Sequence, residues 1–429
     1  MTDDSKLYAR VSLRLIPFLF ACYVCAYLDR VNVGFAKLQM LDELGWSEVV
    51  YGFGAGIFFI GYFFFEVPSN LLMLRIGARR TIARIMIAWG LISAAMLFVS
   101  TPLMFYVLRF LLGVAEAGFF PGVIFYLTLW FPAARRGKVV ALFATAVAIS
   151  IVIGGPLSGF IMSHFDGVSA LSGWQWLFLL EGLPSIAMGF VALNYLDDSI
   201  DEARWLSPTE KSYLKQQLDP PAGTHHRVVD AFRLPAVWVM AAIYFSLVMG
   251  LYGLNFWIPT IMRELGYASV LQIGLLTAIP FTAAALCMVL VGHNADRTNE
   301  RHWHIVIPAA IGAIGLVASV ALVDTPALAI AALTVAACGI FSAIPQAWGL
   351  ATGFLAGGAA AAGIALINSI GNLSGFVAPS AIGWIKETTG STASGMYLLA
   401  GSLMLGAVLV LLVRPPIGGR ISDGARVNE

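Results

Sequence analysis

The polar stretch Gly292-His-Asn-Ala-Asp296-Arg297-Thr-Asn299-Glu-Arg301 separates two apolar segments, residues 270–292 and 303–323. A related stretch, Asn70-Leu-Leu-Met-Leu74-Arg75-Ile-Gly77-Ala-Arg79-Arg80, follows the apolar segment 49–74. Each stretch follows the second long apolar segment of its own half of the chain, so together they indicate an internal repeat. The sequence therefore predicts a fold made of two related halves.

The apolar segments on either side of these stretches are long enough to cross a membrane, which takes about 20 mostly apolar residues. Twelve such segments are predicted, at 11–33, 49–74, 81–100, 103–126, 138–162, 173–196, 235–260, 270–292, 303–323, 326–350, 359–384 and 394–413. The first segment ends in Tyr27-Leu28-Asp29-Arg30 and no small-residue cleavage site follows. We therefore expect it to be retained rather than removed as a signal peptide.

The composition agrees with a membrane protein. Apolar residues make up 59% of the chain and charged residues 11%, whereas soluble domains contain about 25% charged residues. The 25 basic and 24 acidic side chains leave no net field to attract a polyanion. A soluble globular protein, a disordered chain and a nucleic-acid binder are therefore excluded.

The basic residues set the expected orientation. Most of them fall in alternate loops and in both tails, while the opposite loops contain Lys37, Arg263 and Lys386. The positive-inside rule then places both termini in the cytoplasm. The polar stretch 197–234 divides the chain into a six-helix bundle (1–196), a cytoplasmic linker and a second six-helix bundle (235–429). Within the linker, Ser207 and Pro208 predict a short helix that runs to Leu218.

A few charged residues lie inside predicted membrane segments, where each costs about 2.5–3.5 kcal/mol. Arg109 and Glu116 are two helical turns apart and share one face of the fourth segment. Asp29 and Arg30 close the first segment and point in directions about 100° apart. Both sets are either functional or structural, and we favour function because such groups usually line a cavity.

The loop stretches resemble the signature of the major facilitator superfamily, Gly-x-x-x-Asp-Arg-x-Gly-x-Arg. The second copy keeps Gly292, Asp296, Arg297 and Arg301, and the first keeps Arg75, Gly77, Arg79 and Arg80. These eight residues are the expected gating loops. The first copy has Leu74 in place of the carboxylate that normally pairs with a neighbouring helix. The resemblance implies an all-α membrane protein with twelve transmembrane helices in two bundles and a site between them.

The pattern Tyr27-x-Asp29-Arg30-x-Asn32, together with Arg109-(x6)-Glu116, resembles the anion:cation symporter family within that superfamily. Its members include bacterial tartrate, phthalate, hydroxyphenylacetate and sugar-acid carriers. The resemblance implies that Asp29 and Glu116 take up protons, that Arg30 binds the substrate carboxylate and that Arg109 links the two acids. Tyr27 and either Asn368 or Asn372 would help to hold the substrate.

The second half contributes polar and aromatic groups to its membrane segments. The expected substrate-binding residues are Tyr27, Arg30, Asn32, Tyr252, Asn255, Trp348, Asn368 and Asn372. Taken singly, each of these residues in the second half is better explained by a hydrogen bond between helices than by contact with a ligand. Glu66 and Glu181 are further acids in predicted segments. They could belong to a proton path, but structural pairing is the favoured interpretation, with Glu66 beside cytoplasmic arginines.

Other functions lack their usual motifs. No phosphate-binding loop or nucleophile elbow occurs, the histidines do not have metal-ligand spacing, and the four cysteines lie in apolar segments. We expect no cofactor, no metal and no enzyme activity. The predicted function is proton-coupled symport of a small organic anion by a monomer embedded in lipid in a bacterial inner membrane. An anion exchanger or uniporter without proton coupling is the alternative.

Overall fold

The computed structural model describes residues 3–218, 234–354 and 359–413, and this part of the chain is helical throughout. Residues 219–233 of the predicted linker and the tail after residue 413 lie outside the described residues. Twelve helices or helix pairs are long and apolar enough to span a membrane. This number and the approximate positions agree with the twelve predicted segments.

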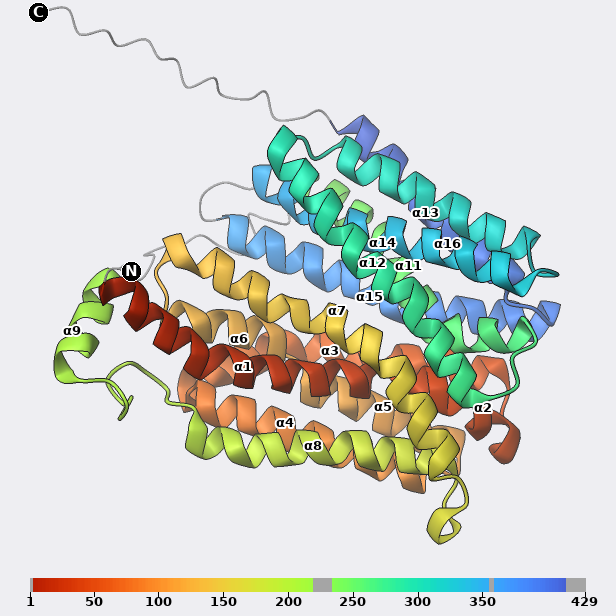
Figure 1. Cartoon of the computed structure of the whole chain (residues 1–429), viewed down its shortest axis with the longest axis horizontal. Helices are drawn as coiled ribbons and strands as arrows, with labels where there is room; N and C mark the ends of the chain where they lie inside the picture. The colour runs from red at the N-terminus through yellow and green to blue at the C-terminus, as the bar shows by residue number, and fades with distance from the viewer. Residues whose placement is uncertain (1–2, 219–233, 355–358, 414–429) are drawn as a thin grey trace, which may run out of the picture.

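Two groups of helices lie side by side (Figure 1). The first bundle consists of α1 (Asp3–Val31), α2 (Val33–Leu44), α3 (Glu48–Ile76), α4 (Ala78–Ala95), α5 (Pro102–Glu116), α6 (Phe119–Thr128), α7 (Ala133–His164) and α8 (Gly173–Tyr195). The second bundle consists of α11 (Pro235–Glu264), α12 (Val270–Thr298), α13 (Trp303–Ala321), α14 (Pro326–Phe354), α15 (Ala359–Thr389) and α16 (Ala393–Leu412). The bundles touch mainly where α3 packs on α15 and where α7 packs on α12.

Helix α9 (Pro208–Gln217) lies at the same end of the molecule as the start of α1 (Figure 1). We call this end the terminal end, and the opposite end, where α2 lies, the distal end. The Ser207 side chain accepts from the Glu210 backbone N–H, and the Glu210 side chain accepts from the Ser207 backbone N–H. This reciprocal cap confirms the predicted start of the linker helix.

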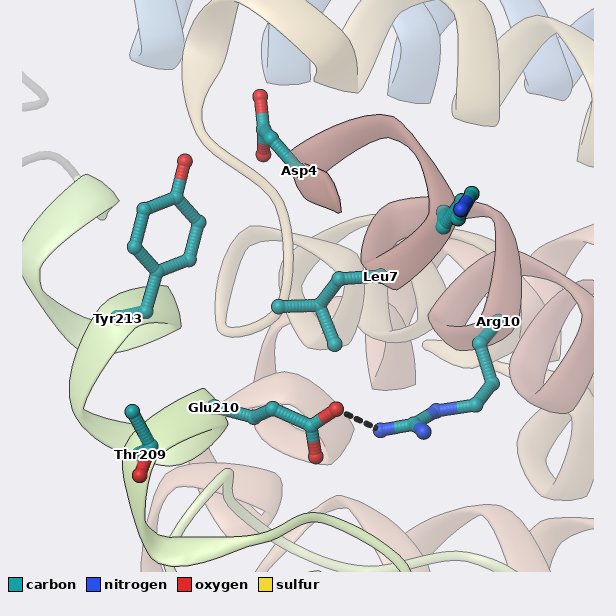
Figure 2. A pocket seen from close by; sticks show the side chains of 7 residues that line it. Asp4, Leu7, Arg10, Thr209, Glu210 and Tyr213 are labelled. Carbon is teal, nitrogen blue, oxygen red and sulfur yellow. Dashed lines mark ion pairs between the residues drawn. The ribbon is translucent and has the colours of Figure 1, made fainter. Parts of the chain in front are cut away.

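The linker helix is held against the first bundle at a surface pocket (Figure 2). Glu210 forms an ion pair with Arg10 of α1 at 2.6 Å, and Tyr213 faces Asp4. The Ser207 backbone N–H and the Arg10 guanidinium together lower the pKa of Glu210. Because both partners of the ion pair are partly exposed, it contributes little to stability and mainly fixes where α9 lies.

The first and fourth spans differ in detail from the prediction. The helical path of the first span continues through Asn32 to Leu44 instead of ending near residue 33. Lys37, expected in a loop, is therefore inside α2 and 4% exposed, so that expectation was wrong. The fourth span breaks after Glu116, because Gly118 adopts a left-handed conformation with φ of 85°. A side chain at Gly118 would be strained there and would also meet Ser69 of α3.

Close helix contacts in the first bundle depend on small residues. At Gly113 of α5, an added Cβ would overlap the backbone carbonyl of Phe58 on α3. The Phe58 carbonyl belongs to a helix and has no freedom to move aside. This contact fixes the distance between α5, which carries Arg109 and Glu116, and α3.

Replacing Gly113 by alanine is therefore expected to destabilise the folded protein by about 1–3 kcal/mol, the usual effect of overpacking a core. Thermal unfolding of the purified protein in detergent measures the change. Gly401→Ala is the matched control, because Gly401 lies within α16 and an added Cβ would meet nothing within 4 Å. Because alanine favours a helix more than glycine does, Gly401→Ala should be neutral or slightly stabilising, and an equal loss of stability in both variants would show that contact with α3 is not responsible.

Candidate functional site

Arg30 and Glu116 form a buried ion pair inside the first bundle. Arg30 comes from the last turn of α1 and is 8% exposed, and Glu116 ends α5 and is 2% exposed. The guanidinium lies 5.6, 5.5 and 5.6 Å from the ring centroids of Tyr27, Phe58 and Tyr62. The Arg30 Nε has no hydrogen-bond partner in the protein. One edge of the guanidinium therefore remains able to donate to a ligand.

Asp29 occupies a different environment from its neighbour Arg30. Its carboxylate accepts hydrogen bonds from Trp89 Nε1 at 2.7 Å, Ser93 Oγ at 2.7 Å and Ser185 Oγ at 2.9 Å. The side chain is 1% exposed, and its partners come from α4 and α8. The two adjacent residues thus face different sides of α1, as their angular separation of about 100° on the helix predicts.

Arg109 is fully buried on α5, two helical turns before Glu116. It donates hydrogen bonds to the backbone carbonyls of Gly54 at 3.3 Å and Ala55 at 3.2 Å, both on α3. Its guanidinium also lies 5.2 Å from the centroid of the Phe58 ring. Its charge acts on Glu116 and Asp29 from a distance rather than through a hydrogen bond to either acid.

The second bundle presents polar groups to the ion pair. The Tyr252 hydroxyl of α11 lies beside Arg30 and donates to Asn372 Oδ1 of α15 at 3.2 Å. Asn255 Nδ2, one turn further along α11, donates to the Tyr27 hydroxyl at 3.3 Å. The predicted residues Tyr27, Arg30, Tyr252, Asn255 and Asn372 therefore meet between the bundles, with the charged groups on one side only.

Glu66 is part of this interface, which corrects the expectation of an arginine partner. Its Oε1 accepts from Asn368 Nδ2 of α15 at 3.4 Å, so the contact crosses from the first bundle to the second. Its Oε2 is buried and has no partner in the protein. Glu66 is also close enough to Arg30 for their charges to interact. The described structure thus places a third acid at the site.

Two predicted binding residues lie elsewhere. Asn32 is 1% exposed and faces Glu181 within the first bundle, away from the second bundle. Trp348 of α14 packs on Tyr244, with ring centroids 4.7 Å apart. The structure does not bring either side chain to the Arg30–Glu116 pair.

The predicted gating loops lie at the terminal end and are built differently in the two bundles. In the second, Arg301 contacts Asp296 Oδ1 and Gln346 Oε1, each at 2.5 Å. In the first, Asp198 accepts from the Arg79 backbone N–H at 2.8 Å. Asp198 comes from the chain after α8 and supplies the carboxylate that is missing at Leu74.

Four charged side chains join the bundles at the distal end, and we call them the distal charge cluster. Lys37 and Glu48 of the first bundle are 2.6 Å apart, and Lys386 and Glu264 of the second are 3.1 Å apart. Lys386 also reaches Glu48 across the interface at 2.7 Å. The Lys37 Nζ donates to Thr260 Oγ1 of α11 at 2.9 Å. The distal end is therefore closed by contacts between the bundles.

Several of these residues were missed by the sequence analysis. Trp89 and Ser93 are four residues apart on one face of α4, and this spacing is visible in the sequence. Ser185 and Glu181 show the same spacing on α8. No comparable signal marks Tyr62 or Phe58, because aromatic residues are common throughout these segments.

The chain is similar to known proteins in sequence and in fold. The family model described as Major Facilitator Superfamily matches residues 19–379. NicT of Pseudomonas putida, named for metabolite transport, is 47% identical over 409 residues and covers 94% of each chain. A protein of Agrobacterium vitis named for tartrate transport is 46% identical over 426 residues and covers 98% of each chain.

Among solved structures, a bacterial homologue of the human lysosomal transporter Spinster, in an inward-facing and unoccupied conformation, has the same fold with a TM-score of 0.74. The match covers 94% of this chain and 95% of that chain at 15% sequence identity. At this identity the likeness concerns the arrangement of helices and not the residues of the site.

Proposed function

Because this chain belongs to the Major Facilitator Superfamily, we propose that it transports a small organic anion together with a proton. It is a multi-pass transport protein of a bacterial inner membrane and not an enzyme. The substrate class, the proton coupling and a cytoplasmic position for the terminal end are proposed. One observation carries the proposal: a buried arginine with a free donor edge is paired with a buried acid at the contact between the bundles.

The substrate proposed is a carboxylate. A guanidinium binds a carboxylate through two parallel hydrogen bonds, and the Arg30 Nε is available for one of them. The rings around Arg30 exclude water and strengthen the attraction. Tyr252, Asn255 and Asn372 stand opposite and can bind hydroxyl groups or a second carboxylate. A hydroxylated dicarboxylate of the tartrate type suits this combination.

The proton enters the proposal through Glu116. In the unloaded site Glu116 neutralises Arg30, and an incoming anion must compete with it for the guanidinium. A proton bound by Glu116 removes this competition and leaves Arg30 to the anion. Proton and anion then favour each other's binding, which is a positive coupling free energy between two nearby ligands.

Movement between two conformations completes the proposal. The hydrogen bonds and ion pairs between the bundles are concentrated at the distal end, from the distal charge cluster to the Tyr27–Asn255 contact. We propose that this conformation opens towards the terminal end. Transport then requires the distal contacts to break and the bundles to close at the terminal end, so that Arg30 faces each side of the membrane in turn.

Two measurements on the purified protein test the function. A thermal-shift screen of monocarboxylates, dicarboxylates, sugar acids and aromatic acids should identify the bound class, because a ligand of the folded state raises the unfolding temperature. In proteoliposomes, the selected acid should accumulate against its own gradient when the medium is more acidic than the lumen. Exchange of internal for external acid without accumulation would instead identify an exchanger, and net uptake that ignores the pH gradient would identify a uniporter.

A further inference from the structure

A further buried acid of the first bundle, Glu181, lies close enough to Asp29 for their charges to interact. Glu181 of α8 is 4% exposed. Its Oε1 accepts from Ser158 Oγ of α7 at 3.2 Å, and its Oε2 has no partner in the protein. In the described part of the chain no lysine or arginine forms an ion pair with it. The structural pairing expected for Glu181 is therefore provided by a hydroxyl group and not by a basic residue.

The polar atoms around Glu181 are also incompletely bonded. Asn32 faces the Glu181 carboxyl, yet neither its Nδ2 nor its Oδ1 has a hydrogen-bond partner in the protein. Buried polar atoms are nearly always bonded, and those without a protein partner are where ordered water binds. Asn32 is one helical turn from Asp29, so these atoms lie between the two acids.

The polar groups around Glu181 extend to the interface between the bundles. The Ser158 hydroxyl that binds Glu181 also lines a small cavity between α1, α7, α11 and α12. Asn255 and Thr277 of the second bundle line the same cavity. In the opposite direction, these polar groups extend to Asp29. Ser185, one helical turn after Glu181 on α8, donates a hydrogen bond to Asp29.

Other groups that act on the two acids come from every helix packed around them. Helix α1 contributes the Cys25 thiol, α4 contributes Trp89 and Ser93, and α8 contributes Ser185. Glu116 and Arg109 act on Asp29 from α5. Among the described residues, Asp29 therefore accepts three hydrogen bonds, whereas Glu181 accepts one from Ser158 and has the Asn32 side chain facing it.

We propose that Glu181 and Asp29 form a coupled pair of proton-binding carboxyls, which Ser158 connects to the cavity between the bundles. An unpaired buried carboxylate carries a large free-energy cost, which a bound proton removes. Two neighbouring acids that form no ion pair do not both ionise readily, so the pair retains at least one proton while it releases another. In a concerted relay, the Ser158 hydroxyl passes its proton to a Glu181 oxygen while it takes up a proton from a hydronium ion in the cavity, which is left as water.

The role of the Glu181–Asp29 pair in transport rests on the proposed proton coupling, to which the pair adds a second proton-binding site. It adds a proton store that does not touch the substrate. Glu116 then responds to the anion at Arg30, whereas the Glu181–Asp29 pair responds to pH at the bundle interface. A purely structural Glu181 would only fasten α8 to α7 through Ser158.

Glu181→Gln separates the two roles, because glutamine keeps the shape and the acceptor for Ser158 but binds no proton. Accumulation driven by a pH gradient should fall roughly tenfold, within the range of a coupling free energy of 1–3 kcal/mol. Exchange at equal pH on both sides should stay within about twofold of wild type, because the substrate site is untouched. The acid selected by the thermal-shift screen serves as the transported probe.

Ser158→Ala should retain the acid pair but slow its response to a pH gradient, and Ser319→Ala, a buried serine of the second bundle, is its matched control. Infrared titration of wild-type protein should show a protonated carboxyl band that Glu181→Gln removes. If Glu181→Gln accumulates the acid to the wild-type level and keeps the protonated carboxyl band, the proposal of a proton-binding Glu181–Asp29 pair is wrong. If wild type itself does not accumulate the acid, the proposed function fails, while the infrared band still decides whether Glu181 binds a proton.

Discussion

Replacing Arg30 by lysine is expected to weaken binding of the organic anion by about ten- to a hundredfold, because hydrogen bonds to charged groups are each worth about 1.5–3 kcal/mol. Lysine keeps the positive charge but presents a point charge instead of a planar fork. The Nε edge that is free in Arg30 has no counterpart in lysine. Equilibrium binding to the purified protein measures the change.

Arg10→Lys is the matched control for this result. Arg10 also forms an ion pair with a glutamate, at 2.6 Å from Glu210, but half of its side chain is exposed. We expect no measurable change in anion affinity from this variant. Unchanged affinity in Arg30→Lys would remove Arg30 from the substrate site, and equal losses in both variants would point to a general effect of lost arginine.

Glu116→Gln is expected to abolish accumulation driven by a pH gradient while leaving exchange of anion for anion in place. Glutamine can still accept a hydrogen bond from Arg30, but it neither neutralises the guanidinium nor takes up a proton. In wild type, the affinity for the anion should rise as the pH falls, because protonation of Glu116 releases Arg30. In Glu116→Gln, the affinity should be high and the contribution of residue 116 to its pH dependence should be lost.

Transport in proteoliposomes with and without a pH gradient checks this prediction. Glu210→Gln is the matched control, because Glu210 is also paired with an arginine but lies in the linker helix. Full accumulation by Glu116→Gln would exclude Glu116 as the coupling acid. Loss of both accumulation and exchange would show that Arg30 needs a full counter-charge to stay in place.

Much of the fold could be predicted because a membrane imposes one length and one hydropathy on every span. The twelve segments and the linker helix at Pro208 follow from such local patterns. The break at Gly118 and the continuation of the first span past Asn32 could not be predicted in this way. Both depend on contacts with α3 and α11, which lie far away in the sequence.

The charged part of the candidate site and several of its polar residues were predictable. Arg30 and Glu116 stand out because charge is rare in a span, and the structure pairs them. The partners of Asp29 escaped notice because serine and tryptophan are ordinary residues of a membrane helix. The Asn368 contact of Glu66 and the burial of Lys37 arise from the way the two bundles meet. No local pattern records that geometry.

The distal charge cluster has a consequence for energetics. When the distal end opens, Lys37 can keep Glu48 and Lys386 can keep Glu264, so each bundle retains an electrically neutral pair. Within the cluster, the Lys386–Glu48 ion pair and the hydrogen bond from Lys37 to Thr260 have to be broken. None of the four charges of the cluster is therefore left without a partner when the distal end opens, and the cluster moves no net charge across the membrane. The membrane potential is worth about 2.3 kcal/mol per elementary charge at 100 mV. It then acts on the transported anion and proton and not on the distal charge cluster.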